Sequence, residues 1–205
     1  ACDNLPMELY RGEVSATGCV TISDGVNSLS TESFSIGVNI PAPNSNQLWY
    51  FTSDGQPVEF KSNNGPAIVS VDNPLYEKYV VTFAENLTHI PSAYFNSKSK
   101  VTRVVLPNSI TSMDNDAFQR CFDLTTINIP SGITQLSQMM FSVTKLRNVY
   151  IDDLAAWCSI TFNGPILEGL EENTTKSALY VQGNRVSEIT IPQSVSKIPR
   201  YAFMF

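Results

Sequence analysis

Two consecutive stretches, Val101-Thr-Arg-Val-Val-Leu106-Pro107 and Leu124-Thr-Thr-Ile-Asn-Ile129-Pro130, share one pattern of apolar residues. Their prolines are 23 residues apart, and so are the phenylalanines that follow them, Phe118 and Phe141. A fixed period of this kind indicates an internal repeat. The shared pattern, Leu-x-x-Ile-x-Ile-Pro-x-x-Ile-x-x-Leu-x-x-x-x-Phe, predicts a short strand that ends at a proline, followed by a compact return segment. Stacked copies of such a unit form a solenoid with a parallel sheet.

The same apolar positions recur outside this pair. Residues 79–100 form an earlier copy in which Phe95 lies 23 residues before Phe118, and a last copy runs from Val186 to Phe203. We therefore predict an α/β repeat fold, a leucine-rich-repeat solenoid with a period of about 23 residues over 79–205. The pattern is interrupted at about 152–178, where we expect an insertion.

Two regions precede the predicted repeats. Residues 1–46 contain short alternating stretches between turn-forming residues, which indicate a small N-terminal β region and linker. Residues 47–78 are predicted to form a β-hairpin cap, in which Val58–Phe60 pairs with the strand that begins at Gln47. We expect Trp49 to close the open end of the repeat core rather than to stack on a ligand, because solenoid ends need a cap.

The later part of the chain contains two local signals. Asp153 precedes Leu-Ala-Ala-Trp-Cys158, which predicts a short helix capped by an aspartate. The stretch Leu179–Asn184 predicts a strand that ends in a Gly-Asn turn.

Composition excludes several classes of protein. The net charge is −6, and the 13 lysines and arginines form no run, so we do not expect nucleic acid to bind. No stretch of about 18 apolar residues is present to span a bilayer. The four cysteines include no Cys-x-x-Cys pair, which argues against a metal knuckle or a dithiol site. We expect Cys121 and Cys158 to be buried, unreactive thiols.

Several motifs together resemble the BspA-like leucine-rich-repeat proteins of host-associated anaerobic bacteria. They are the Ile-Pro-x-Ser and Ala-Phe signatures of the repeats, the segment Asp153–Cys158 and the segment Leu179–Val186. The resemblance covers residues 47–205. It implies an exported bacterial surface or outer-membrane protein that acts as an adhesin toward host matrix or other microbes.

The start of the chain suggests how such a protein is anchored. Ala1-Cys2-Asp3 looks like the junction at which a bacterial lipoprotein signal is cleaved, which leaves Cys2 as the acylated residue. The alternative is a cysteine without a role beside a terminal alanine. We expect a lipid on Cys2 to be the only attachment to a membrane.

The sequence contains few groups that could support catalysis. The single histidine, His89, is expected on a return segment with its ring in solvent, and no serine has an evident base. Asp114 and Asp116 are better explained as caps of the turn before Ala117 than as calcium ligands, because the glycine and distal glutamate of a calcium loop are missing. We therefore predict no enzymatic activity, no cofactor and no metal site.

The predicted strands suggest a binding surface instead. Because side chains alternate along a strand, the residues between the apolar positions face away from the core. In stacked strands they form columns on one open face, which begins with Val80 and Thr82. The expected site residues are Arg103, Val105, Thr126, Asn128, Asn148, Tyr150, Glu188 and Thr190.

We expect this face to bind a host extracellular-matrix protein, a microbial surface protein or a glycan, without catalysis. One alternative is a carbohydrate-binding module for nutrient capture, with Tyr150 and either Tyr180 or Tyr79 as an aromatic platform. Another is a structural spacer or self-assembly unit that associates through its C-terminal repeat. The sequence alone does not identify the ligand.

Overall fold

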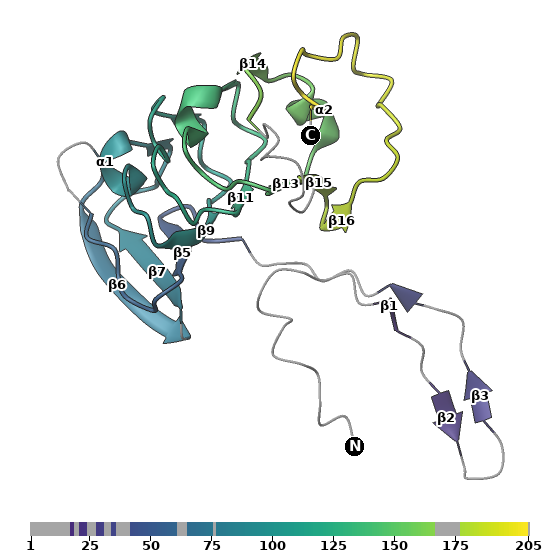
Figure 1. Cartoon of the computed structure of the whole chain (residues 1–205), viewed down its shortest axis with the longest axis horizontal. Helices are drawn as coiled ribbons and strands as arrows, with labels where there is room; N and C mark the ends of the chain where they lie inside the picture. Colours follow the sequence, from purple (N-terminus) through teal and green to yellow (C-terminus); the bar gives the residue numbers. More distant parts are fainter. Residues whose placement is uncertain are drawn as a thin grey trace. The chain divides into compact units, whose positions relative to one another are not determined.

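A computed structural model describes residues 42–60, 65–75, 77–166 and 177–204, together with four short strands near the N-terminus. The chain divides into two units, Ala1–Pro41 and Ala42–Phe205 (Figure 1). In the first unit the strands pair antiparallel, β1 with β4 and β2 with β3. Their bounds are β1 Thr17–Gly18, β2 Thr21–Ser23, β3 Ser28–Ser30 and β4 Phe34–Ser35. Cys2 and Cys19 lie outside the described residues.

The second unit is built on an eight-stranded sheet with the strand order β16-β15-β13-β11-β9-β5-β7-β6. Strands β9, β11, β13 and β15 pair parallel, as expected for successive repeats. The bounds are β5 Gln47–Thr52, β6 Ile68–Leu75, β7 Lys78–Phe83, β9 Val101–Val105, β11 Thr126–Asn128, β13 Asn148–Ile151, β15 Ala178–Val181 and β16 Asn184–Arg185.

Short elements in the return segments lie on the other side of the core from this sheet (Figure 1). Two parallel ladders link neighbouring segments, β8 with β10 and β12 with β14. The expected aspartate cap is confirmed, since the Asp153 carboxylate accepts hydrogen bonds from Ala155 and Ala156 at the start of α2. The bounds are β8 His89–Ile90, α1 Ser92–Phe95, β10 Ser112–Met113, β12 Gln135–Ser137, η3 Gln138–Phe141, α2 Leu154–Trp157 and β14 Thr161–Asn163.

The core lies between the sheet and the return segments. Three phenylalanines stack along it, with ring centroids 5.2 Å apart for Phe95 and Phe118 and 5.6 Å apart for Phe118 and Phe141. Cys121 is buried and its thiol donates to the Phe95 carbonyl at 2.9 Å. Cys158 is also buried, so the expectation for both thiols is confirmed. Apolar side chains one period apart therefore stack on one another in a continuous core.

The N-terminal cap differs from its prediction. Val58–Phe60 forms no strand, because Pro57 lacks the N–H that a ladder needs there and the Val58 N–H donates to the Tyr50 hydroxyl instead. β5 instead lies between β7 and β9 and runs antiparallel to both. Its inward side chains, Leu48 and Tyr50, are buried in the core, and β7 lies beyond them toward the N-terminal edge of the sheet. The expectation that Trp49 closes the end of the core is wrong, since Trp49 lies on the opposite face.

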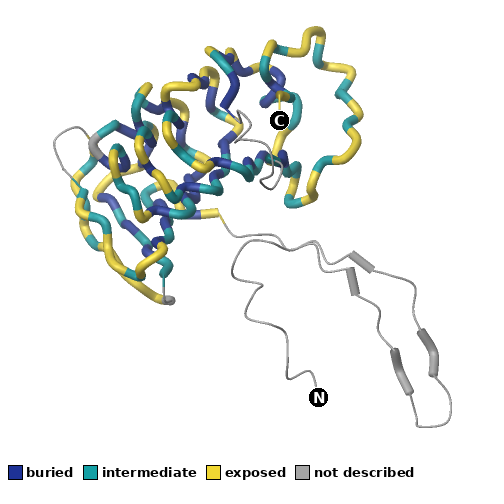
Figure 2. Tube along the Cα trace, in the orientation of Figure 1, coloured by how far each residue is buried: buried dark blue, intermediate teal, exposed yellow. Residues whose placement is uncertain are grey.

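The last predicted repeat is also arranged differently. The position beside β13 is taken by β15, and β16 turns back on β15 as an antiparallel hairpin. The two turn residues are Gln182 and Gly183, both with positive φ, so the predicted turn lies one residue earlier than Gly-Asn. No strand is described in residues 186–204. Figure 2 shows this segment mainly exposed or half-buried, whereas the inner side of the central coils is buried.

Candidate functional site

Side chains on β5, β7, β9, β11, β13 and β15 point away from the core and form a continuous surface, here called the outer sheet face. They alternate with buried residues, as the burial patterns of β5, β7 and β13 show directly. The outer sheet face comprises Trp49, Phe51, Lys78, Val80, Thr82, Arg103, Val105, Thr126, Asn128, Asn148, Tyr150 and Tyr180.

Six of the eight sequence-predicted site residues lie on this face. Arg103, Thr126 and Asn148 form one row across three strands. Asn128 and Tyr150 pair in the next row, which Val105 joins from β9. Glu188 and Thr190 do not belong to the face, because they follow β16 in a segment where no strand is described. Those two predictions are wrong because the β15–β16 hairpin occupies the edge that a further repeat strand would take.

Two of the six have structural roles that restrict what they can bind. Val105 is only 7% exposed. The Asn128 amide clamps the backbone at the end of β9, since its Oδ1 accepts from the Leu106 N–H at 2.7 Å and its Nδ2 donates to the Leu106 carbonyl at 2.9 Å. Arg103 and Tyr150 are therefore better candidates for contact with a ligand.

β5 adds two aromatic residues that the expected columns did not contain. Lys78 Nζ lies 3.8 Å from the centroid of the Trp49 ring, and Arg103 Cζ lies 5.3 Å from that of Phe51. Both distances are within the range of cation–π interactions. The insertion of β5 also separates Val80 from the Arg103 strand, so the expected column of Val80 and Thr82 beside Arg103 is wrong.

The electrostatics of the two cations follow from their surroundings. Burial lowers the pKa of Lys78, and the positive charge of Arg103 lowers it further. Burial also lowers the pKa of Arg103, while the nearby Tyr150 hydroxyl raises that pKa. Both side chains are thus partly removed from water beside another cation.

A tyrosine pair lies farther along the same face. Tyr150 on β13 and Tyr180 on β15 are in register, and their rings stack with centroids 4.3 Å apart and planes inclined by 11°. Tyr79, the other aromatic considered from the sequence, is buried against Tyr50 and belongs to the core. Tyr150 and Tyr180 are therefore the pair that the face presents to solvent.

The single histidine lies on a return segment as expected, and its side chain is 41% exposed, but the ring also has polar partners. His89 Nδ1 lies 2.8 Å from Ser112 Oγ, and its Nε2 lies 3.1 Å from Asp114 Oδ1. The second oxygen of Asp114 accepts from the Ser92 N–H at the start of α1. The Asp114 carboxylate thus links its own return segment to the preceding one at two points, His89 and Ser92, and its backbone carbonyl accepts from the Ala117 N–H in the turn.

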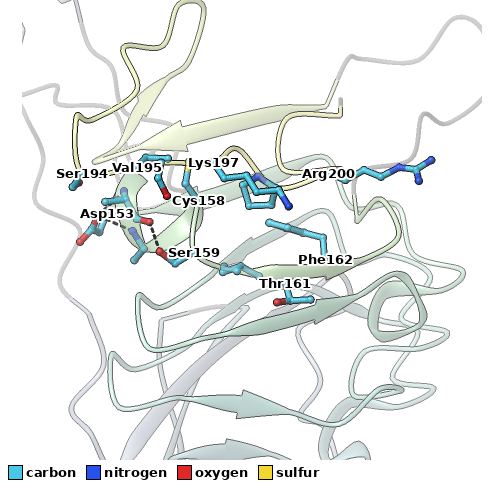
Figure 3. A pocket seen from close by; sticks show the side chains of 14 residues that line it. Asp153, Cys158, Ser159, Thr161, Phe162, Ser194, Val195, Lys197 and Arg200 are labelled. Atoms are coloured by element: carbon cyan, nitrogen blue, oxygen red, sulfur yellow. Dashed lines mark hydrogen bonds between the residues drawn. The ribbon is translucent and has the colours of Figure 1, made fainter.

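A hollow in the described surface lies near the C-terminus, with a volume of about 770 Å³. Figure 3 shows Val195 and Lys197 on one side of this pocket and Ser159, Thr161 and Phe162 on the other, while Arg200 extends away from it. Cys158 lines the pocket, but burial raises its thiol pKa, and the Ser159 hydroxyl donates to the Ala155 carbonyl. None of the lining residues is a histidine that could activate either group. The pocket therefore carries no evident nucleophile and base.

Two further features are absent from the described residues. These residues contain no group of three or more histidine, cysteine, aspartate or glutamate side chains placed to hold a metal ion. No helix among them has the length and apolar character needed to cross a membrane.

Comparison with known proteins identifies the repeats. The model of the BspA type leucine rich repeat region matches residues 78–168 and 170–205, in six copies. No curated protein and no solved structure matches the chain. The match covers more than half of the sequence and begins with β7, so β5 and β6 lie before it. The chain belongs to the BspA-type leucine-rich-repeat family.

Proposed function

We propose that this chain is a non-enzymatic binding module whose coils form a leucine-rich-repeat solenoid and whose outer sheet face holds a partner protein. Leucine-rich repeats generally mediate contacts between proteins. The parallel strands and the stacked phenylalanines support a regular period. The Thr125 hydroxyl supports it too, because it donates to the carbonyl of Thr102, 23 residues earlier. In such stacks the sheet offers an extended surface for a partner.

The observation that carries the proposal is the composition of the outer sheet face. Trp49, Arg103, Tyr150 and Tyr180 are half-buried, and they lie on four strands of one sheet, β5, β9, β13 and β15. Tryptophan, tyrosine and arginine are the residue types that contribute most binding energy in protein interfaces. A rigid sheet also loses little conformational entropy when a partner binds.

A glycan is the second candidate ligand, and the Tyr150–Tyr180 pair is what favours it. Sugars stack on aromatic faces, but each of these rings already uses one face against the other. The rings of Trp49 and Phe51 are covered by cations in the same way. Because each of the four rings already uses one of its two sides in such a contact, the outer sheet face fits a protein partner better than a sugar platform.

The cellular location is part of the same proposal. Proteins of this family are typically associated with bacterial surfaces. We place this chain at the surface of a bacterium, where it acts as an adhesin that a lipid on Cys2 anchors to the membrane. Mass spectrometry of the N-terminal peptide from the native host tests the anchor, and an unmodified Cys2 thiol contradicts it.

The binding proposal is tested with the purified chain on immobilised extracellular-matrix proteins and on a glycan array. The variant Tyr150→Ala/Tyr180→Ala should weaken any specific protein contact by about 2 kcal/mol or more, roughly thirtyfold. Tyr201→Ala is the matched control, because Tyr201 is half-buried in the last coil, away from the sheet. A protein contact that survives the double variant contradicts the proposed site, and binding to glycans alone selects the second candidate.

A further inference from the structure

Two cations lie on either side of β5 on the outer sheet face. Phe51 pairs with Lys78 on β7 and with Arg103 on β9, so the two side chains start from positions on either side of Phe51. Each then lies over a different ring of β5, Lys78 over Trp49 and Arg103 over Phe51. These contacts orient the ammonium and the guanidinium on the outer sheet face.

Neither cation has an acidic partner among the described residues. The two ion pairs found there join His89 to Asp114 and Lys145 to Asp123. Asp72 shares the face with the cations, since β6 places it opposite Val80, but its carboxylate accepts a hydrogen bond from the Ser70 hydroxyl and makes no ion pair with Lys78. In a chain with a net charge of −6, two such cations without a carboxylate from any described residue are unusual.

This arrangement is costly without a ligand. Burial destabilises the charged forms of both Lys78 and Arg103, and each repels the other. No hydrogen bond from either side chain to a described residue is present, although a guanidinium has five donors and an ammonium three. An anion between them would supply acceptors and cancel the repulsion.

We propose that Lys78 and Arg103 bind a carboxylate side chain, glutamate or aspartate, on an acidic segment of the partner protein. This inference rests on the proposed function and names the chemistry of its ligand. Trp49 and Phe51 form the floor of the site, and their rings keep the cations oriented toward solvent. Tyr150, whose hydroxyl interacts electrostatically with Arg103, borders the site on the side of β13.

Two observations favour a polypeptide over other anions. An acidic sugar that stacks on Trp49 or Phe51 would compete with the cation that already lies over one side of each ring. A long polyanion such as nucleic acid would be repelled by the net charge of −6. An isolated carboxylate among neutral residues avoids both problems.

The test uses the full chain and two capped peptides displayed densely on a sensor, acetyl-Tyr-Glu-Tyr-Glu-Tyr-amide and its twin with glutamine in place of glutamate. The native protein should bind the glutamate peptide at least about tenfold more strongly than the glutamine peptide. The variant Lys78→Gln/Arg103→Gln should lose that preference. Oligogalacturonate on a third sensor represents acidic sugars.

Lys197→Gln/Arg200→Gln is the matched control. It makes the same change in net charge, and Arg200 likewise lies over an aromatic ring, with its Cζ 4.8 Å from the Tyr201 centroid. This variant should keep the native preference within about twofold. Should Lys78→Gln/Arg103→Gln fail to fold, salt gives a second readout: raising NaCl from about 50 to about 500 mM should weaken only the glutamate peptide.

Several results would overturn the proposal. They are equal binding of the two peptides, no binding of either peptide by the native protein, an equal loss in both double variants, and a preference for oligogalacturonate. The proposed function is tested separately by the tyrosine variants. A partner protein that depends on Tyr150 and Tyr180 but not on Lys78 and Arg103 would leave the function intact and remove the carboxylate site.

Discussion

The coil of residues 124–145 and the last coil, residues 186–204, share one apolar pattern but differ in burial. Ile133 and Leu136 in the central coil are 2% and 0% exposed. Their counterparts in the last coil are Val195, which is half-buried, and Ile198, which is 51% exposed. The same residue types at the same spacing are therefore fully buried in one coil and only partly buried or exposed in the other.

The difference comes from the neighbours of each coil. β11 pairs with β9 on one side and β13 on the other, and β12 pairs with β14. The last coil contributes no described strand to the sheet. It is held by contacts such as the hydrogen bond of 3.0 Å from the Trp157 indole to the Ala202 carbonyl. In a repeat protein the sequence provides an apolar pattern, and adjacent coils provide its burial.

The stacked phenylalanines should give the largest difference in stability between variants of the central coils and variants of the last coil. Phe118→Ala removes a ring packed between Phe95 and Phe141 and should cost about 3–5 kcal/mol, which lowers the melting temperature by roughly 10 °C. Phe203→Ala at the equivalent, half-buried position should cost clearly less. Thermal unfolding followed by circular dichroism measures both, and equal losses would show that the last coil is as well packed as the central one.

A second pair tests the aliphatic positions. Leu136→Ala should destabilise the protein by about 2–5 kcal/mol because it leaves a cavity in the core. Ile198→Ala should change the free energy of unfolding by less than about 1 kcal/mol, since half of that side chain already contacts water. Urea unfolding gives both values. A large loss for Ile198→Ala would mean that a contact in solution covers the last coil.

A third pair concerns the asparagine clamp. Asn128→Ala leaves the Leu106 N–H and carbonyl without their side-chain partner and should cost about 1–3 kcal/mol. Thr190 holds the equivalent position in the last coil and is exposed, so Thr190→Ala should stay within about 0.5 kcal/mol of the native protein. The same urea experiment measures both, and a neutral Asn128→Ala would refute the clamp.

The smallest expected effect is a difference in reactivity between the thiols of Cys121 and Cys158, which does not involve a change in stability. Burial raises the pKa of Cys121 to about 12, so almost no thiolate exists near neutral pH. Cys158 also has a raised pKa but lines the C-terminal pocket. Iodoacetamide should therefore modify Cys158 before Cys121, as measured by peptide mass spectrometry of the folded protein. Faster labelling of Cys121 would show that the central coils open more readily than the last one.

The repeat strands could be predicted from the sequence because their signal is local and recurs. The positions of Ile127 and Ile129, the aspartate cap at Asp153 and the parallel pairing of the central strands all follow from periodicity and capping rules. Six site residues were placed on the correct face for the same reason.

The remaining features depend on contacts between distant segments. The alternation in Gln47–Thr52 predicts a strand but cannot show that it lies between β7 and β9, where Trp49 and Phe51 meet Lys78 and Arg103. Glu188 and Thr190 are absent from the outer sheet face because the β15–β16 hairpin occupies the edge of the sheet. Neither outcome has a local signal in the sequence.

The position of β5 also determines the order in which the molecule can be completed during synthesis. β5 leaves the ribosome before both of its neighbours, and its pairing with β9 requires Val105 to have emerged. Each later parallel strand needs only the strand one coil earlier. The N-terminal end of the stack therefore closes through slow, long-range contacts, and the following coils can then add one at a time as the chain grows.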